Sequence, residues 1–205
     1  MTPGPFELLV GTKNRKKAAE IRRLLTGLSV TVLDLSGFDE LPDVAEEGLT
    51  FEENAVAKAA GFARMTGLAT IADDSGLEVD ALGGRPGVYS ARFAGENADD
   101  EANNRLLLKM LANTPAVERT ARFRCVIALA TPEESVFTCE GSVEGVITTE
   151  PRGTGGFGYD PLFYLAQCSA TFGELPGEVK DRFSHRARAL GRFKRLFAEF
   201  LAARR

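Results

Sequence analysis

The sequence predicts an α/β protein built on a mixed β-sheet. In the first part of the chain, short apolar runs alternate with segments whose apolar residues recur at helical spacing. Later, two longer strand patterns follow each other directly, as in a hairpin. Strands connected by helices, followed by a hairpin, indicate a mixed sheet. A length of 205 residues is enough to bury the core of one large domain or of two small lobes.

Strands are expected where apolar runs are bounded by turn residues. They cover residues 6–10, 30–35, 69–73, 120–130 and 135–147. The third of these, ATIAD, is expected to end at the paired aspartates Asp73 and Asp74, because the turn-forming pair Ser-Gly follows. The last two are expected to form a hairpin around Thr131 and Pro132.

Helices are expected where apolar residues recur every three or four positions. The first carries Ala18, Ile21, Leu24 and Leu25. The second opens at a capping box of Thr50 and Glu53 and ends at Gly67, after the acidic loop 37–48. A third lies near 99–112. The last begins after Ser184 and has an apolar face formed by Leu190, Phe193, Leu196, Phe197, Phe200 and Leu201.

Composition narrows the class of protein. A net charge of −4 argues against a general nucleic-acid binder, which is normally basic. No apolar run approaches the roughly 20 residues that span a bilayer, and the N-terminus lacks the pattern of a signal peptide. The three cysteines show no CxxC spacing. We therefore expect a cytoplasmic protein with reduced thiols and with neither nucleic acid nor membrane as a partner.

The first candidate site segment is GTKNRKK, residues 11–17. Asn14 can cap the helix that follows, and the free N–H groups at that helix start attract anions. Cations next to the positive end of a helix are unfavourable unless an anion neutralises them. The segment nevertheless holds Lys13, Arg15, Lys16 and Lys17. It is interpreted as a phosphate-binding segment, with a solvated basic turn as the alternative.

The second segment is Asp73-Asp74-Ser75. Successive side chains of a strand point to opposite sides, so one aspartate can face a ligand while the other braces the backbone. Carboxylates are natural ligands of Mg²⁺, and the loop residues Glu46 and Glu47 could supply another. The doublet is interpreted as part of a metal site, with turn chemistry as the alternative.

Two further segments follow later in the chain. GTGGFGYDP, residues 153–161, combines glycines that permit close approach with Phe157 and Tyr159, whose rings could stack on a ligand; such loops are also common as plain structure, and Asp160 could be a turn residue. KDRFSHR, residues 180–186, holds the one histidine, His185, beside Arg186 at a helix start. A neutral His185 could donate to a base oxygen, and a surface histidine is the alternative.

Taken in this order, the segments resemble the inosine/xanthosine triphosphate pyrophosphatases. The similarity extends over nearly the whole chain. It is carried by TKNRKK, EEGLTFEENAVAKA, IADDSGLEVDALGGRPGVYSARFAG, GTGGFGYDPLF and K(x)₄HRARAL. The resemblance implies a two-lobed ITPase-like α/β fold with the active-site cleft between the lobes, and a homodimer. Because the sequence does not separate the lobes, residues 1–205 are treated as one domain.

The resemblance also implies Mg²⁺-dependent hydrolysis of non-canonical purine nucleoside triphosphates (ITP, dITP and XTP) to the monophosphate and pyrophosphate. By motif position, the triphosphate would be held by Thr12, Asn14 and Lys17, with Lys58 nearby. Glu46 and Asp74 would bind the metal, and Asp74 would accept the proton of the attacking water. The nucleotide would be contacted by Ser75, Phe157, Gly158, Tyr159, Asp160, Lys180, His185 and Arg186. Lys13 and Lys16 stand where the family usually has Gly.

Base selection is expected at the 157–160 loop and at the helix start of His185 and Arg186. A guanidinium or imidazole donor that faces O6 is satisfied by hypoxanthine or xanthine and left unpaired by adenine, whereas the exclusion of guanine is not assigned. Three alternatives stay open. They are a pyrophosphatase for modified pyrimidine or other damaged nucleotides, a nucleotide-binding regulator without hydrolysis, and a protein-binding module.

Overall fold

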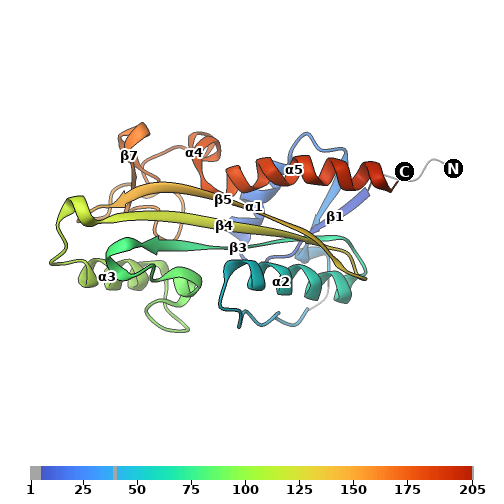
Figure 1. The fold of residues 1–205 in the computed structure, drawn as a ribbon, viewed down its shortest axis with the longest axis horizontal. Helices are drawn as coiled ribbons and strands as arrows, with labels where there is room; N and C mark the ends of the chain where they lie inside the picture. The colour runs from blue at the N-terminus through green and yellow to red at the C-terminus, as the bar shows by residue number, and fades with distance from the viewer. Residues whose placement is uncertain (1–5, 39–40, 205) are drawn as a thin grey trace. The chain divides into compact units, whose positions relative to one another are not determined.

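The computed structural model describes residues 6–38 and 41–204 and contains a mixed sheet of seven strands within them (Figure 1). The strands are β1 (Phe6–Val10), β2 (Val30–Asp34), β3 (Thr70–Val79), β4 (Thr120–Ala130), β5 (Ser135–Ile147), β6 (Phe163–Leu165) and β7 (Ala170–Thr171). Their order in the sheet is β2-β1-β3-β4-β5-β6-β7. Strand β1 pairs in parallel with β2 and β3, whereas β6 pairs antiparallel with β5 and β7. The predicted α/β fold with a mixed sheet is confirmed.

Five α-helices accompany the strands in the described part of the chain. They are α1 (Arg15–Leu25), α2 (Phe51–Thr66), α3 (Asp100–Met110), α4 (Gly177–Phe183) and α5 (His185–Ala203). The capping box of Thr50 and Glu53 is present at the start of α2, and Gly67 ends that helix in the left-handed conformation with φ 72°. These local signals placed α2 correctly because they satisfy backbone groups that a helix leaves open at its ends. No helix in the described residues is long and apolar enough to cross a membrane.

The chain divides into two compact units, in agreement with the two lobes that the resemblance implied. Unit 1 consists of residues 1–74, 125–141 and 186–205. Unit 2 consists of residues 75–124 and 142–185. Strands β3, β4 and β5 contribute residues to both.

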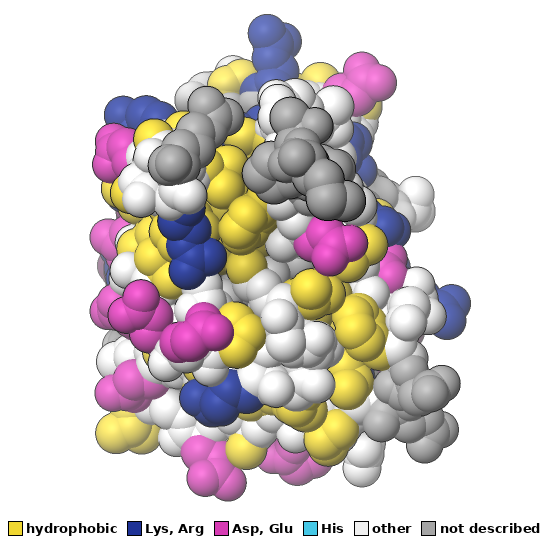
Figure 2. All heavy atoms as spheres, turned by 90° about the vertical axis from the view of Figure 1, so that its right-hand side faces the viewer, with side chains coloured by type: hydrophobic (Ala, Val, Ile, Leu, Met, Phe, Trp, Pro, Cys, Tyr) yellow, Lys and Arg dark blue, Asp and Glu magenta, His cyan; other side chains and the backbone are white. Residues whose placement is uncertain are grey.

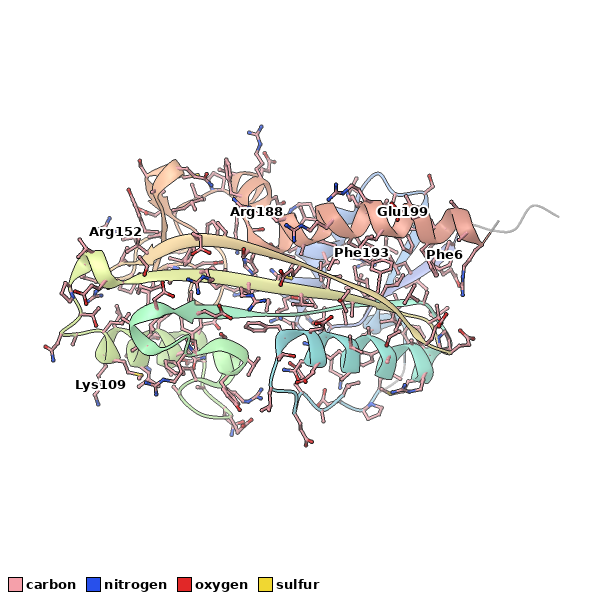
Figure 3. The ribbon with its side chains drawn as sticks, in the orientation of Figure 1. Phe6, Lys109, Arg152, Arg188, Phe193 and Glu199 are labelled. Carbon is pink, nitrogen blue, oxygen red and sulfur yellow. The ribbon has the colours of Figure 1, made fainter. Side chains whose placement is uncertain are left out.

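The core of unit 1 lies between its helices and the strands beside them. It contains Leu8, Val10, Ile21, Leu25, Ile71, Cys125, Ile127, Leu129, Ala189, Leu190, Phe193 and Phe197. Helix α5 contributes Leu190, Phe193 and Phe197 of its predicted apolar face to this core. Phe193 lies between the helix and the strands (Figure 3). Phe197 also contacts the ring of Phe6 edge-on. On the outer face shown in Figure 2, lysine, arginine and acidic side chains are interspersed rather than gathered by sign.

Unit 2 has a separate core. It contains Leu77, Val79, Leu107, Leu111, Ala121, Phe123, Val143, Ile147, Tyr159, Leu162, Phe163, Leu165 and Phe172. The rings of Phe123, Phe163 and Phe172 pack together in this core. Their centroids lie between 4.6 and 6.0 Å apart.

The prediction that a strand ends at the paired aspartates is wrong. Strand β3 runs from Thr70 through Asp73 and Asp74 to Val79. The Ser-Gly pair that suggested a turn is followed by Leu77 and Val79, both fully buried in the core of unit 2. Burial of this second apolar pair and continued pairing in the sheet outweigh the local turn preference. The doublet therefore sits within a long strand.

Candidate active site

Asp73 is a buried carboxylate surrounded by cations of unit 1. Its Oδ2 accepts hydrogen bonds from Nη2 and Nε of Arg186 at 3.0 and 3.3 Å, and Nζ of Lys17 lies 3.4 Å away. Burial by itself would raise the pKa of Asp73, but the charges of Lys17 and Arg186 outweigh burial and hold this pKa well below its ordinary value. The Asp73 side chain has no exposed surface. The charge of Asp73 is balanced by two cations in this structure, and its expected role as a metal ligand stays a prediction.

Arg186 completes this buried group. Its guanidinium is 1% exposed, and Nη1 donates to Oε2 of Glu20 at 2.8 Å. The donors that the sequence analysis assigned to O6 of the base are thus directed at two carboxylates inside unit 1. A buried carboxylate without a counter-charge is strongly unfavourable. Asp73 and Glu20 therefore need a cation beside them, and Arg186 supplies it. In this structure Arg186 is bonded to these two carboxylates, and its base-reading role stays a prediction.

Asp74 points to the other side of β3, into a different environment. Its Oδ2 accepts a hydrogen bond from Nδ2 of Asn54 at 3.0 Å, and its Oδ1 lies 3.5 Å from Nζ of Lys58. Burial raises the pKa of Asp74, and the nearby charges of Lys58 and Lys17 offset this rise only in part. Asp74 is therefore the more basic member of the doublet, as a proton acceptor should be.

Glu46 lies close to the same ammonium group. Its Oε2 is 3.2 Å from Nζ of Lys58, which is 9% exposed. The loop that carries Glu46 is fixed to α2, because the N–H of Gly48 donates to Oδ1 of Asn54 at 2.8 Å. The loop backbone also approaches α2 closely, since a Cβ on Gly61 would lie 2.7 Å from a methyl group of Val44. The carboxylates of Glu46 and Asp74 thus both lie beside the ammonium group of Lys58.

The donor set of Glu46 and Asp74 fits a magnesium ion. Mg²⁺ in proteins is commonly bound by one or two carboxylates, with water and substrate phosphates as the other ligands. In the described residues, no group of three or more His, Cys, Asp or Glu side chains is arranged to hold a metal. The two carboxylates instead lie beside the ammonium of Lys58, which balances their charge in this structure.

The start of α1 has the predicted anion-binding geometry. Oδ1 of Asn14 accepts from the N–H groups of Lys16 and Lys17 at 3.0 and 3.1 Å, which makes Asn14 the N-cap. Oγ1 of Thr12 accepts from the N–H of Asn14 at 3.2 Å. The side chains of Arg15 and Lys16 are exposed. Lys17, in contrast, is mostly buried and lies against Asp73. Of these three predicted phosphate-binding cations, two are therefore exposed and one is paired with a buried carboxylate.

Lys13 lies against the acidic loop in this structure. Its Nζ donates to the carbonyl oxygen of Leu41 at 2.8 Å and lies 2.8 Å from a carboxylate oxygen of Asp43. The ammonium is directed at the acidic loop because that loop presents both a carbonyl and a carboxylate within its reach. Lys13 is partly exposed, and its expected role at the phosphates stays a prediction.

Unit 2 brings together Phe157 and Asp160 from the 153–161 segment and Lys180 from the 180–186 segment. Nζ of Lys180 lies 2.6 Å from Oδ2 of Asp160 and 4.7 Å from the ring centroid of Phe157. The same Asp160 oxygen accepts from the N–H of Phe157 at 2.8 Å. Ser75, at the unit boundary, is half-buried. The half-buried ring of Phe157 is therefore held between a cation and its own loop.

Two neighbouring aromatic groups are buried, contrary to expectation. The ring of Tyr159 belongs to the core of unit 2, and its hydroxyl donates to the carbonyl oxygen of Ser90 at 2.9 Å. It is not available for stacking on a ligand. His185 is 4% exposed and stacks on Phe123 with ring centroids 4.8 Å apart, so the alternative of a surface histidine is wrong. Phe157 remains as the one accessible ring of the two predicted in the 153–161 segment.

Sequence reasoning missed Asn54 and Glu20. Asn54 fixes Asp74 and the loop of Glu46, and Glu20 balances Arg186. A signal for both was available, because each interrupts the otherwise apolar buried face of its helix. Asn54 lies on the buried face of α2 together with Ala55 and Lys58. Glu20 lies on the buried face of α1 together with Ile21 and Leu25. Buried polar residues of this kind require partners and so mark a site or a network.

Comparisons with known proteins give the family. The model of the Ham1 family matches residues 8–196. The dITP/XTP pyrophosphatase of Geobacter sulfurreducens is 56% identical over 91% of this chain and 94% of its own length, and that of Desulforamulus reducens is 52% identical over 90% and 92%. Among solved structures, a HAM1 protein from Coxiella burnetii superposes with a TM-score of 0.86 at 40% identity, covering 95% of this chain and 99% of that chain. The Staphylococcus aureus Ham1 protein superposes with a TM-score of 0.82, also at 40% identity, covering 97% and 100%. This chain belongs to the Ham1 family.

Proposed function

We propose that this protein hydrolyses ITP, dITP and XTP to the monophosphate and pyrophosphate. Its relatives named dITP/XTP pyrophosphatase support this substrate class. The structural observation that carries the proposal is the pair Glu46 and Asp74, held within 3.2 and 3.5 Å of the ammonium of Lys58 in unit 1. A nucleotide-binding regulator would not need a carboxylate of raised pKa at this point, so the non-hydrolysing alternative is not favoured.

The residues of unit 1 divide the chemical work. Asp74 accepts the proton of the attacking water, and Asn54 keeps its carboxylate in one orientation. The N–H groups at the start of α1, with Lys17 and the exposed Arg15 and Lys16, stabilise the phosphate charges and the pyrophosphate leaving group. A magnesium ion, held by Glu46 and Asp74, would supply charge neutralisation on the phosphates and help to activate the water.

For the base, we infer contacts from unit 2. Phe157, with Lys180 over its ring, is the side chain suited to stack on a purine. Stacking does not read the base edge, so we assign keto recognition to backbone groups of the 157–160 loop. We also infer that the protein works as a homodimer, as the resemblance suggests, and in the cytoplasm, as the cysteine pattern suggests.

A substrate panel tests the proposal. The protein is incubated with ITP, dITP, XTP, GTP, ATP and modified pyrimidine triphosphates, with and without Mg²⁺, and pyrophosphate and phosphate are measured separately. We expect pyrophosphate as the first product from the first three, only with Mg²⁺. Phosphate as the first product, or equal rates on ATP, would refute the proposal. Faster turnover of the modified pyrimidines would favour the related alternative.

A matched pair of variants tests the metal assignment. Glu46→Gln removes a carboxylate that lies beside Lys58, whereas Glu47→Gln removes the neighbouring exposed one. We expect the Mg²⁺ concentration for half-maximal activity to rise about tenfold in the Glu46 variant, since Mg²⁺ strongly prefers carboxylate oxygens. The Glu47 variant should match the parent. Equal behaviour of the two variants would contradict the role of Glu46.

A further inference from the structure

The loop that carries Phe157 is held from two sides within unit 2. On one side, Asp160 accepts from Lys180 and from the N–H of Phe157. On the other side, helix α3 contacts Gly158 twice. The N–H of Gly158 donates to Oδ2 of Asp100 at 2.7 Å, and Nδ2 of Asn104 donates to the carbonyl oxygen of Gly158 at 3.0 Å. Both backbone groups of one residue are thereby bonded to α3.

Asp100 and Asn104 are spaced to act together. They are four residues apart, so they lie one above the other on the same face of α3. Gly158 between them has φ +61°, in the left-handed region that favours glycine. A Cβ at this position would meet nothing within 4 Å. The glycine is therefore required by its backbone conformation and not by crowding, and the two hydrogen bonds hold that conformation.

We propose that Asp100 and Asn104 are positioning residues that fix Gly158, and through it hold the ring of Phe157 ready to stack on the purine base. The inference rests on the proposed function, because it concerns the loop assigned to the base. Neither residue was singled out by the sequence motifs. The clamp is defined as two hydrogen bonds, one donated by the N–H of Gly158 to Asp100 and one donated by Asn104 to the carbonyl oxygen of Gly158.

The surroundings of Asn104 support this role. The residue is 9% exposed, and its Oδ1 is buried without a hydrogen-bond partner among the described residues. An unsatisfied buried acceptor is unfavourable, so an apolar residue would be the stable choice if the position only filled space. The orientation of the amide is fixed, since its nitrogen must face the carbonyl oxygen of Gly158. The donor function of Asn104 thus explains why a polar residue stands there.

The neighbouring Asn103 provides a matched control. It is 3% exposed, and it also bridges the backbone of a loop from α3. Its Oδ1 accepts from the N–H of Ala94, and its Nδ2 donates to the carbonyl oxygen of Ala91. The two asparagines therefore have the same chemistry and similar burial. Only Asn104 contacts the 157–160 loop, so loss of each amide should have a different effect on Phe157.

A single-tryptophan probe separates the clamp from catalysis. The chain contains no tryptophan, so Phe157→Trp places one reporter in the loop. Into this background we introduce Asp100→Ala, Asn104→Ala or Asn103→Ala and measure quenching of the ligand-free protein by acrylamide. We expect the quenching constant to rise at least twofold for the first two and to stay unchanged for Asn103→Ala. This readout requires no turnover, so it tests the clamp even if the proposed function is wrong.

Ligand titrations with the same variants test the consequence for recognition. We expect Asp100→Ala and Asn104→Ala to weaken ITP binding, followed by tryptophan quenching, by five- to tenfold. Inhibition by tripolyphosphate, which carries no base, should stay unchanged, and Asn103→Ala should leave both constants as in the parent. If Asn104→Ala behaves like Asn103→Ala in the acrylamide measurement, the clamp does not exist. If its quenching constant rises but ITP and tripolyphosphate weaken equally, the clamp does not serve the base.

Discussion

Replacing Arg186 with methionine separates the structural role of this residue from the base-reading role that the sequence suggested. Methionine has a similar length but no charge, so the substitution removes the guanidinium bonded to Asp73 and Glu20. Asp73 would keep Lys17 as its cation, whereas Glu20 would lose its partner in a buried position. Base reading predicts a folded protein with altered specificity. Burial between two carboxylates predicts a destabilised protein.

The structure indicates a large effect on stability. Arg186 is 1% exposed, and the side chains of Asp73 and Glu20 are 0% and 6% exposed. Removing one partner of a buried ion pair lowers the free energy of unfolding by roughly 3–5 kcal/mol. Domains are typically stable by only about 5–15 kcal/mol, so the loss is a large fraction of the total. For a chain of this size it corresponds to a fall of roughly 6–20 °C in Tm.

The assay is urea unfolding followed by far-ultraviolet circular dichroism, with thermal unfolding in parallel. The matched control is Arg188→Met, two residues along α5, which replaces an exposed arginine (Figure 3). It should change the free energy of unfolding by less than about 0.5 kcal/mol. The triple variant with Asp73→Asn and Glu20→Gln should recover much of the lost stability, because it removes the uncompensated charges.

One result would refute this reasoning. If the Arg186 variant unfolds at the same urea concentration as the Arg188 variant, the guanidinium does not hold a buried network. If in addition its ITP-to-ATP ratio of kcat/KM falls, Arg186 reads the base as the sequence predicted.

The remaining predictions concern the residues of unit 1. Asp74→Asn should lower kcat more than about 100-fold, because the amide cannot accept a proton, while the urea midpoint stays within error of the parent; activity within a few-fold of the parent would make Asp74 a structural residue. Lys17→Ala should raise KM for ITP and the inhibition constant of tripolyphosphate by the same factor, since its charge lies at the phosphate end; a changed base preference with unaltered KM would contradict this placement. EDTA should abolish pyrophosphate release and Mg²⁺ should restore it, and activity that persists in EDTA would rule out the metal assignment.

Sequence signals predicted best what is decided locally. The cap at Asn14, the capping box at Thr50 and the glycine at the end of α2 all appear as expected, because each satisfies backbone groups a few residues away. The end of β3 was misplaced for the opposite reason. Asp, Ser and Gly favour a turn locally, but pairing in the sheet and burial of Leu77 extend the strand, and neither can be seen in a short window.

The site itself was predicted by residue type more reliably than by role. Glu46, Asp74 and Lys58 come together in unit 1 as the motifs indicated. Arg186 was grouped with His185 because the two are adjacent, but its partner Asp73 is 113 positions away in the chain. Successive residues of a helix point about 100° apart, so adjacency gave no reason for a shared role. A charged residue in a buried helix face indicates a distant counter-charge, and the sequence does not show which one.

The paired aspartates illustrate how neighbours in sequence acquire different chemistry. Alternation along β3 turns Asp73 towards Arg186 and Lys17 and turns Asp74 towards Asn54 and Lys58. The pKa of Asp73 falls although burial opposes it, and the pKa of Asp74 rises because burial dominates there. A general base needs the higher proton affinity, whereas a carboxylate that holds Lys17 in place must remain ionised. If both aspartates faced one side, their charges would oppose each other and one would take up a proton. The strand therefore supplies a fixed anion and a proton acceptor from consecutive residues only because it continues through them.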